Sequence, residues 1–147
     1  MDAVKTIESG YYQIKKAKNH PKISLKDAIR SCKSNAVITE IKKASPSLGT
    51  IRENLDPKEI ALAMERAGAI GISVLTEPVN FDGSLEILKQ AREATKLPVL
   101  MKDIVIVADQ IEAAAKLGAN AVLLIKALFD RRCTEMGVDK MIAFAHS

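Results

Sequence analysis

Short apolar runs alternate with amphipathic segments along most of this chain. Four apolar runs begin near residues 36, 70, 98 and 120, and their length and composition predict buried strands. The segments between them carry apolar residues at helical spacing, which predicts helices. Apolar strands separated by helices are typical of a parallel sheet in the α/β class. We therefore expect four strand-helix units joined by right-handed crossovers.

Residues with capping preferences mark where the expected helices begin and end. Asp56, with Glu59 three residues later, predicts the start of the helix after the first strand. Ser84 predicts the start of the helix after the second strand. Gly68 and Gly118 follow two of the expected helices, and glycine readily ends a helix. The helix boundaries are therefore marked by local sequence signals.

The first 35 residues follow a different pattern from the rest. Apolar residues at helical spacing predict a helix over about residues 1–18, and Ser24 predicts a second, short helix after Pro21. We therefore expect an N-terminal helical extension at 1–35 and a single, incomplete strand-helix domain at 36–147.

The C-terminal part is expected to contain the fourth strand and a helical tail. The strand is predicted to extend from Asn120 to Leu128, so that Lys126 lies near its end. From about Asp130 onward the pattern is helical, with Gly137 as a break.

Composition narrows the class of partner that the chain binds. The 147 residues are 48% hydrophobic and 27% charged, as in an ordinary globular domain, and the net charge is +4. Without a dense basic block or interleaved aromatic residues, this mild charge does not predict a nucleic-acid partner, but it suits an anionic small molecule. No apolar run approaches the roughly 20 residues that span a bilayer, so we expect no membrane partner.

The two cysteines and two histidines do not form a metal-binding pattern. Cys32 and Cys133 lie far apart, and neither His20 nor His146 sits in a cluster of ligand residues. We therefore expect no metal site. Two isolated cysteines also indicate a reducing compartment, which predicts a cytoplasmic location.

Polar residues near the C-terminal ends of the strands are the candidates for chemistry. Four strand-helix units fit either an open doubly wound sheet or a strand-helix barrel. The first strand-to-helix loop carries neither G-x-G-x-x-G nor G-x-x-x-x-G-K-[ST], which argues against the common nucleotide-binding open sheet. In a barrel, catalytic groups lie at the C-terminal ends of strands. The polar residues at these ends are Glu40, Lys42, Thr76, Glu77, Lys102, Asp103 and Lys126.

Alternation along the strands is expected to bring three of these charges to one mouth. Glu40 and Lys42 are two residues apart and share a face, and the third strand places Lys102 on the corresponding face. Two interpretations stay open. One is a structural ion pair between Glu40 and either lysine. The other is a site in which a lysine donates a proton or binds an anion.

The loops after the strands carry weaker signals. Ser45 and Ser47 in "ASPSLG" suit either a simple turn or hydroxyl contacts to a phosphate. Phe81, in a loop after the second strand, suits either stacking on an aromatic ligand or packing at the rim of the barrel. A solvated side chain is expected for Lys126.

Taken together, the motifs resemble those of a known enzyme family. The stretches "ITEIKKASPSLG", "ISVLTEPVNFDGS", "LPVLMKD" and "GANAVLLI", in this order, resemble indole-3-glycerol phosphate synthase. The stretch "ISLKDAIRSCKSNAVITEIK" resembles the segment that precedes that family's barrel. The resemblance covers nearly the whole chain and implies a TIM (β/α)8 barrel. Because a complete barrel takes about 250 residues, we expect only the first four units of one, a truncated barrel.

The resemblance implies a step of tryptophan biosynthesis. The family converts 1-(2-carboxyphenylamino)-1-deoxyribulose 5-phosphate to indole-3-glycerol phosphate with loss of carbon dioxide and water. It is a carbon-carbon lyase of the carboxy-lyase type and needs no metal or organic cofactor. By resemblance, three residues are catalytic. Lys102 is the general acid, Lys42 binds the anionic groups of the substrate and helps in proton transfer, and Glu40 orients the lysines and the substrate hydroxyls.

The same resemblance implies binding roles for three further residues. Ser45 contributes to the phosphate end, and Phe81 and Leu123 line an apolar pocket for the anthranilate ring. The family's later strands supply a second catalytic glutamate, an asparagine and most of the phosphate-binding residues, so we expect this chain alone to be inactive. Three positions depart from the family's usual residues: Asn80, Ile104 and Lys126.

Two alternatives to the enzyme are a non-catalytic half-barrel module and another phosphate-binding barrel protein. Half a barrel leaves its first and fourth strands as unpaired edges and exposes apolar residues of the barrel interior. Such a chain is expected to form a homo-oligomer or to pair with a complementing C-terminal half.

Overall fold

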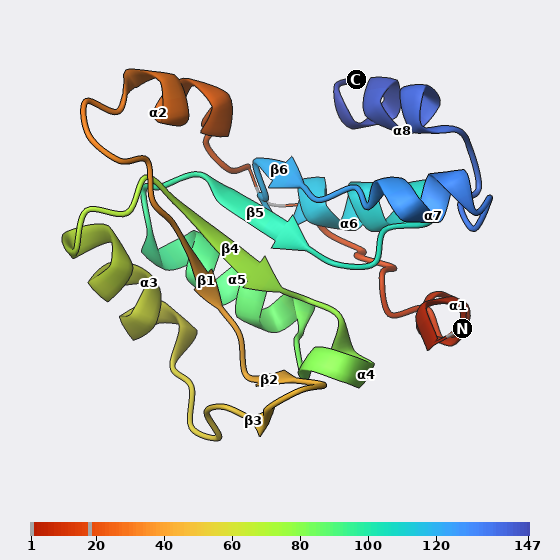
Figure 1. The fold of residues 1–147 in the computed structure, drawn as a ribbon, viewed down its shortest axis with the longest axis horizontal. Helices are drawn as coiled ribbons and strands as arrows, with labels where there is room; N and C mark the ends of the chain where they lie inside the picture. Colours follow the sequence, from red (N-terminus) through yellow and green to blue (C-terminus); the bar gives the residue numbers. More distant parts are fainter. Residues whose placement is uncertain (1, 18) are drawn as a thin grey trace.

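A four-stranded parallel sheet lies at the centre of this computed structural model, which describes residues 2–17 and 19–147 (Figure 1). The strands lie side by side in the order in which they occur in the chain, and every neighbouring pair is parallel. They are β1 (Ile38–Ile41), β4 (Gly71–Leu75), β5 (Val99–Lys102) and β6 (Ala121–Val122). The prediction of a parallel α/β sheet is confirmed.

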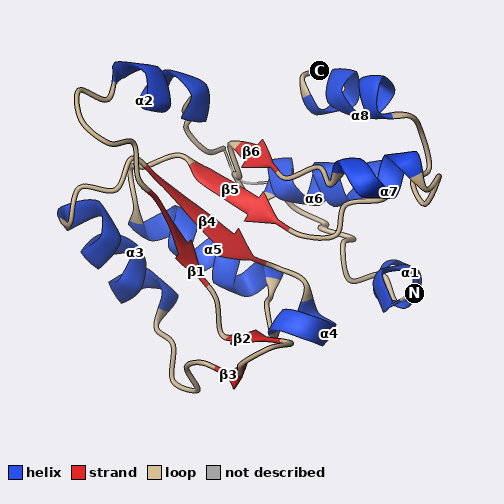
Figure 2. Cartoon of the chain, viewed as in Figure 1, coloured by secondary structure: helices blue, strands red, loops and turns tan. Residues whose placement is uncertain are grey.

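Three helices cover one face of the sheet and form the core with it. Figure 2 shows two of them behind the strands and the third beside them. They are α3 (Pro57–Arg66), α5 (Leu85–Ala94) and α6 (Ala108–Lys116). Ile72, Val74, Val99 and Met101 point to this side and are completely buried. Burial of each such side chain stabilises the fold by roughly 1.5–3 kcal/mol.

The opposite face, which we call the inner face, carries Ile38, Glu40, Ser73 and Leu100. The strand register pairs Glu40 with Ser73 and Ser73 with Leu100, so these three side chains form one row across the sheet. Ile38 lies at the edge of this face and is 40% exposed. The inner face is therefore more open than the face under the helices.

The N-terminal end of the inner face meets the short helix α2 (Leu25–Ser31). Leu25 lies so close to Gly71 that a Cβ atom at this glycine would be 2.8 Å from the Leu25 Cδ1 atom. A side chain at this position would therefore displace the Leu25 side chain. The predicted cap of α2 is confirmed, because the Ser24 side chain accepts a hydrogen bond from the Asp27 backbone N–H at 3.1 Å.

The predicted caps of the other helices are confirmed as well. The Asp56 carboxylate accepts from the backbone N–H groups of Lys58 and Glu59 at the start of α3. Ser84 caps α5 through the Ile87 N–H. Gly68 and Gly118 follow α3 and α6 with φ angles of 90° and 82°, in the left-handed region that favours glycine.

The first predicted helix is wrong in its length. Helix α1 (Asp2–Glu8) ends ten residues before the expected limit at residue 18; residues 1 and 18 themselves lie outside the described part of the chain. Gly10 has a φ of 77°, which an α-helix does not accommodate. The apolar spacing that continued beyond Gly10 includes Tyr11, whose hydroxyl donates to the Thr76 carbonyl at the end of β4.

The fourth strand is also shorter than predicted. Leu123 still donates its N–H to the Met101 carbonyl at 3.1 Å, but the chain then turns, and α7 (Lys126–Asp130) begins at the lysine expected near the end of the strand. An apolar run of this length does not distinguish a strand from a buried helical segment by periodicity. Helix α8 (Val138–Ala145) follows Gly137, as predicted.

A buried polar network closes the N-terminal end of the sheet. Arg92 of α5 is 4% exposed and donates to the Leu97 carbonyl at 2.5 Å and to the Asn120 side-chain oxygen at 3.2 Å. The same oxygen accepts from the Val99 N–H at 3.0 Å. Because buried donors and acceptors are costly when left unpaired, this network stabilises the end of the sheet opposite the charged residues.

The structure contains two short elements that the sequence pattern did not reveal. Helix α4 (Pro78–Phe81) follows β4, and strands β2 (Ala44–Ser45) and β3 (Gly49–Thr50) form a small antiparallel hairpin after β1. In the part of the chain that the structure describes, no helix has the length and apolar character needed to cross a membrane.

Candidate active site

Three charged side chains meet at the C-terminal ends of β1 and β5. A Glu40 carboxylate oxygen lies 2.6 Å from the Lys102 Nζ atom, and its other oxygen lies 3.0 Å from the Lys42 Nζ atom. Lys42 directly follows β1 and Lys102 ends β5, and β4 lies between these two strands in the sheet. The predicted convergence of these residues at one mouth is confirmed.

Strand register explains why these residues meet. Glu40 pairs with Ser73, and Lys102 pairs with Leu75 two residues farther along β4. Lys102 therefore lies one row nearer the C-terminal edge than Glu40, and its long side chain spans the difference. Lys42 follows Glu40 by two residues, so it points to the same face from the end of β1.

The Glu40 carboxylate interacts with both lysines, and these interactions determine its pKa. Burial by itself raises the pKa of Glu40, but hydrogen bonds and charge from Lys102 and Lys42 outweigh it, so the pKa lies below the usual range. The Glu40 and Lys102 side chains are 28% and 40% exposed. The cluster contains two lysines and one glutamate, so its net formal charge is positive. A positive charge suits an anionic ligand.

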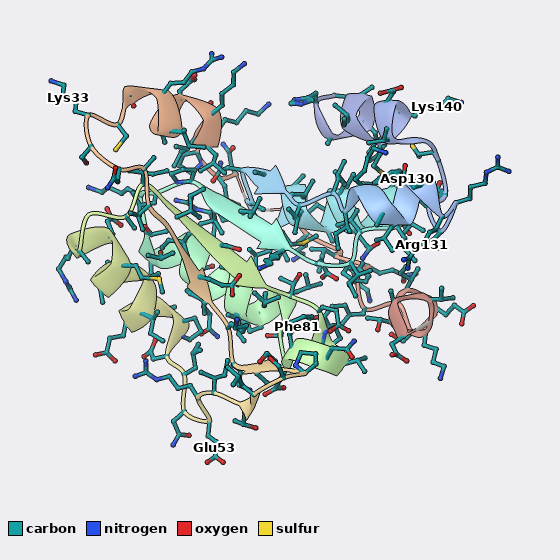
Figure 3. All side chains as sticks on the ribbon, in the orientation of Figure 1. Lys33, Glu53, Phe81, Asp130, Arg131 and Lys140 are labelled. Atoms are coloured by element: carbon teal, nitrogen blue, oxygen red, sulfur yellow. The ribbon has the colours of Figure 1, made fainter. Side chains whose placement is uncertain are left out.

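The predicted pocket residues lie at the same end of the sheet as this cluster. Leu123 extends the β6 ladder beside β5, and alternation places it in the row of Lys102, where it is half-buried. Phe81 is the last residue of α4, not a loop residue as predicted, and it lies at the C-terminal end of the sheet (Figure 3). The hairpin that carries Ser45 contacts α4. Their binding roles remain predictions.

Ser45 is buried, and its hydroxyl makes hydrogen-bond contacts within its own turn. Its hydroxyl accepts from the Leu48 N–H at 3.3 Å and lies 3.5 Å from the Ser47 hydroxyl. Lys43, just before the hairpin, bonds to the Asp82 carboxylate at 2.6 Å and so ties the loop after β1 to the end of α4. The turn interpretation of "ASPSLG" is thus supported.

The three positions that depart from the family pattern lie in different surroundings. Asn80 is exposed on α4, and its backbone N–H bonds to the Glu77 side chain at 2.7 Å. Ile104 is half-buried just beyond β5. Lys126 is exposed, as expected, and pairs with Asp130 at 2.5 Å one helical turn away.

Sequence reasoning missed a buried network behind the mouth. Asp103, which directly follows Lys102, contacts Tyr12 from the N-terminal segment and Thr76 from the end of β4. Asp103 and Thr76 are recognisable in the sequence as polar residues at strand ends, but Tyr12 carries no such signal because it lies 91 residues from Asp103. The Ser73 hydroxyl, in the row of Glu40, is buried without a hydrogen-bond partner among the described residues.

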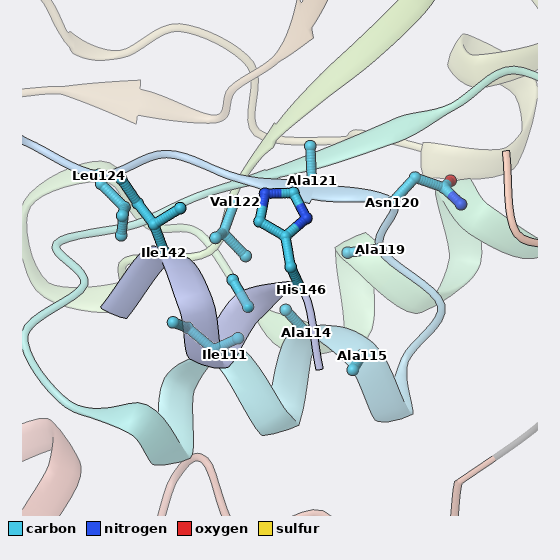
Figure 4. Close-up of a pocket in the computed structure, with 11 residues that line it drawn as sticks. Ile111, Ala114, Ala115, Ala119, Asn120, Ala121, Val122, Leu124, Ile142 and His146 are labelled. Atoms are coloured by element: carbon cyan, nitrogen blue, oxygen red, sulfur yellow. The ribbon is translucent and has the colours of Figure 1, made fainter. Parts of the chain in front are cut away.

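A separate pocket of about 300 Å³ lies away from these charges, between α6, β6 and α8 (Figure 4). It is mostly apolar, with Ile111, Val122 and Ile142 in its wall and Asn120 and His146 as polar groups. None of the predicted site residues lines it. Among residues 2–17 and 19–147, no three His, Cys, Asp or Glu side chains are arranged to hold a metal ion.

The fold and the charged mouth together define a class of protein. Successive parallel strands with helices on one face, and ionisable groups at the C-terminal strand ends, are the features of (β/α)-barrel enzymes. The sequence pattern of one family, indole-3-glycerol phosphate synthase, matches residues 2–146. The chain therefore belongs to the indole-3-glycerol phosphate synthase family.

Individual relatives agree with this assignment. The chain is 56% identical over 100 residues to the indole-3-glycerol phosphate synthase of Neisseria meningitidis serogroup C, covering 68% of this chain and 38% of the relative. It is 52% identical over 108 residues to the synthase of Prochlorococcus marinus subsp. pastoris, covering 74% and 37%. The matched region thus spans well under half the length of these relatives.

A solved structure, the YdjI aldolase of Escherichia coli K12, aligns with a TM-score of 0.45 and 17% identity, covering 75% of this chain and 41% of the aldolase. These values are too low to support a conclusion about function or fold. The assignment to the barrel class rests on the family match and the sheet described above.

Proposed function

We propose that this chain supplies one wall of an indole-3-glycerol phosphate synthase active site. The observation that carries the proposal is the Glu40 carboxylate held between Lys102 and Lys42 at the C-terminal mouth of the sheet. The substrate is 1-(2-carboxyphenylamino)-1-deoxyribulose 5-phosphate, and the reaction is a carboxy-lyase step of tryptophan biosynthesis in the cytoplasm. The ring closure needs a cation and a proton donor beside the developing oxyanion, and the lysine side chains of this cluster can supply both.

The proposed reaction is a ring closure followed by decarboxylation and dehydration. A carbon of the anthranilate ring attacks the ketone carbon of the substrate, and the C=O electron pair moves to oxygen. Lys102 donates a proton to that oxygen. The attacking carbon is the one that bears the carboxylate, and breaking its bond to that group releases carbon dioxide and returns the electron pair to the ring. The new hydroxyl then takes a proton from a general acid and leaves as water, a proton on the adjacent carbon goes to a base, and indole-3-glycerol phosphate remains. Lys42 holds the anionic groups of the substrate, and Glu40 keeps the two ammonium groups in place.

The remaining proposed contacts come from the rim of the mouth. Phe81 and Leu123 border the space for the anthranilate ring, and Ser45 contributes to the phosphate end. The N-terminal extension at 1–35 and the strand-helix part at 36–147 remain our proposed division of the chain. The proposed partners are the phosphorylated substrate and a complementing C-terminal half of the barrel.

The proposal is tested with a fusion in which residues 1–147 precede the segment of the Neisseria meningitidis synthase that follows its matched region. Fluorescence of the indole product reports turnover. We expect turnover by the fusion and none by residues 1–147 alone, because four units leave the proton relay and the phosphate site incomplete. A fusion that folds but forms no product contradicts the proposed function, and robust turnover by the chain alone contradicts the need for a second wall.

The open inner face favours a second candidate, a half-barrel that self-associates. Ile38 is 40% exposed on this face, and β1 and β6 are the edges of the sheet. Exposed apolar side chains beside unpaired strand edges promote association with another chain.

We therefore expect residues 1–147 to sediment as a dimer or larger species whose mass depends on concentration. Ile38→Lys, which places a charge on the inner face, is expected to shift the equilibrium toward the monomer. Leu62→Lys is a matched control, because Leu62 is similarly exposed, at 39%, but lies on α3, which covers the opposite face of the sheet. A monomer at all concentrations, or an equal effect of both substitutions, contradicts association through the inner face.

A further inference from the structure

We propose that the buried Asp103 carboxylate, held by Tyr12 and Thr76, is a positioning group that fixes the strand end carrying Lys102 and fastens the N-terminal segment to the mouth. The role of Lys102 in this proposal rests on the proposed function. The position of Lys102 beside Glu40 is independent of that function. The titration of Glu40 tests the position of Lys102, and kcat tests its role in the reaction.

The carboxylate is surrounded by donors. Asp103 is 4% exposed. The Tyr12 hydroxyl donates to it and lies 3.1 Å from each of its oxygens. The Ile104 backbone N–H donates to one oxygen at 2.7 Å, and the Thr76 hydroxyl donates to the other. A buried carboxylate with this many donors is held in one orientation.

The same residues hold the backbone of Lys102. The Thr76 N–H donates to the Lys102 carbonyl at 3.1 Å, so Thr76 binds both Lys102 and Asp103. Tyr11 adds a second anchor, because its hydroxyl donates to the Thr76 carbonyl at 3.1 Å and accepts from the Leu85 N–H at 2.9 Å. Two adjacent tyrosines of the N-terminal segment therefore brace the ends of β4 and β5.

The segment after Asp103 is fixed from its other side. Gln110 of α6 is completely buried. Its amide nitrogen donates to the Ile104 carbonyl at 3.0 Å, and its amide oxygen accepts from the Ile106 N–H at 2.7 Å. The backbone of Lys102 is thus restrained at its own carbonyl and in the residues that follow it. A misplacement of about 1 Å at a reacting group lowers rates by about a hundredfold, so such restraint matters to catalysis.

The pKa of Tyr12 is consistent with its hydroxyl being the donor to Asp103. Burial raises the pKa of Tyr12, and the charge of Asp103 adds to that effect, so the hydroxyl remains protonated and donates. Burial also raises the pKa of Tyr11, to about 12. The pKa of Asp103 is raised by burial and by nearby Glu77, against the lowering effect of its donors Thr76, Ile104 and Tyr12.

The test compares two small substitutions with a matched control. Tyr12→Phe removes one hydroxyl, and Asp103→Asn keeps the shape but removes the charge. Asn120→Ala is the control, because it breaks a buried polar network at the opposite end of the sheet. The first readout is the titration of the Glu40 carboxyl carbon by NMR in residues 1–147, and the second is kcat of the fusion.

If Asp103 positions Lys102, Tyr12→Phe and Asp103→Asn move the pKa of Glu40 upward toward its ordinary value, because Lys102 no longer holds its place beside the carboxylate. Asn120→Ala leaves the Glu40 titration unchanged. In the fusion, the two network variants lower kcat about 10- to 100-fold with little change in KM, whereas Asn120→Ala lowers stability alone.

Unchanged Glu40 titration in folded Tyr12→Phe and Asp103→Asn chains overturns the positioning role. A shifted Glu40 titration together with a wild-type fusion that forms no product supports the positioning role and overturns the proposed reaction. If Asp103→Asn does not fold, the milder Tyr12→Phe decides the question with the same two readouts.

Discussion

Replacing Lys102 with alanine is expected to lower kcat of the fusion by about a thousandfold. Lys102 is the proposed donor of the proton to the oxyanion, and general acid catalysis contributes on the order of 10²–10⁴ in rate. KM is expected to change much less, because Lys42 remains to bind the anionic groups of the substrate. Turnover is measured as the fluorescence of the indole product over a range of substrate concentrations.

Lys89→Ala is the matched control for this prediction. Lys89 lies on α5, on the helix side of the sheet, and its only described pairing is with Glu86 one turn away. The loss of such an exposed pair changes stability by about 0.5 kcal/mol or less. Equal kinetics for Lys102→Ala and Lys89→Ala would show that Lys102 takes no part in the chemistry.

Replacing Glu40 with glutamine is expected to lower kcat of the fusion about a hundredfold. The amide keeps the size of the side chain but removes the charge that holds Lys102 and Lys42 together. The two ammonium groups then repel each other, and the proton donor leaves its position. Because Glu40 acts through Lys102, the double variant with Lys102→Ala should be hardly slower than Lys102→Ala alone.

The pH dependence gives this prediction a second readout. Interactions with the lysines hold the pKa of Glu40 below 4.5, its ordinary value. Its contribution to stability is therefore complete above that value and is lost as the pH falls through the lower, folded-state pKa. Urea unfolding of residues 1–147 should thus show a smaller loss of stability on acidification in Glu40→Gln than in the unaltered chain. Parallel curves would indicate that the lysines do not stabilise the ionised carboxylate.

Local sequence signals were sufficient for most of the fold. The caps at Ser24, Asp56 and Ser84 were predictable because each cap depends on residues within three positions of it. The lengths of the first helix and the fourth strand were not predictable in this way. Apolar spacing indicates which residues are buried, but it does not show which residues each side chain contacts. Tyr11 fits a helical spacing, yet the structure places its hydroxyl against the Thr76 carbonyl.

The site divides in the same way between sequence and structure. Strand alternation alone placed Glu40, Lys42 and Lys102 on one face, since the two-residue period of a strand is a local property. The tertiary structure decided that one carboxylate serves both lysines, and that Tyr12 and Thr76 hold the strand end behind Lys102. These contacts join residues 27 to 91 positions apart, apart from the local pair of Glu40 and Lys42. They form because parallel register and helix packing bring distant strand ends together, which no local pattern encodes.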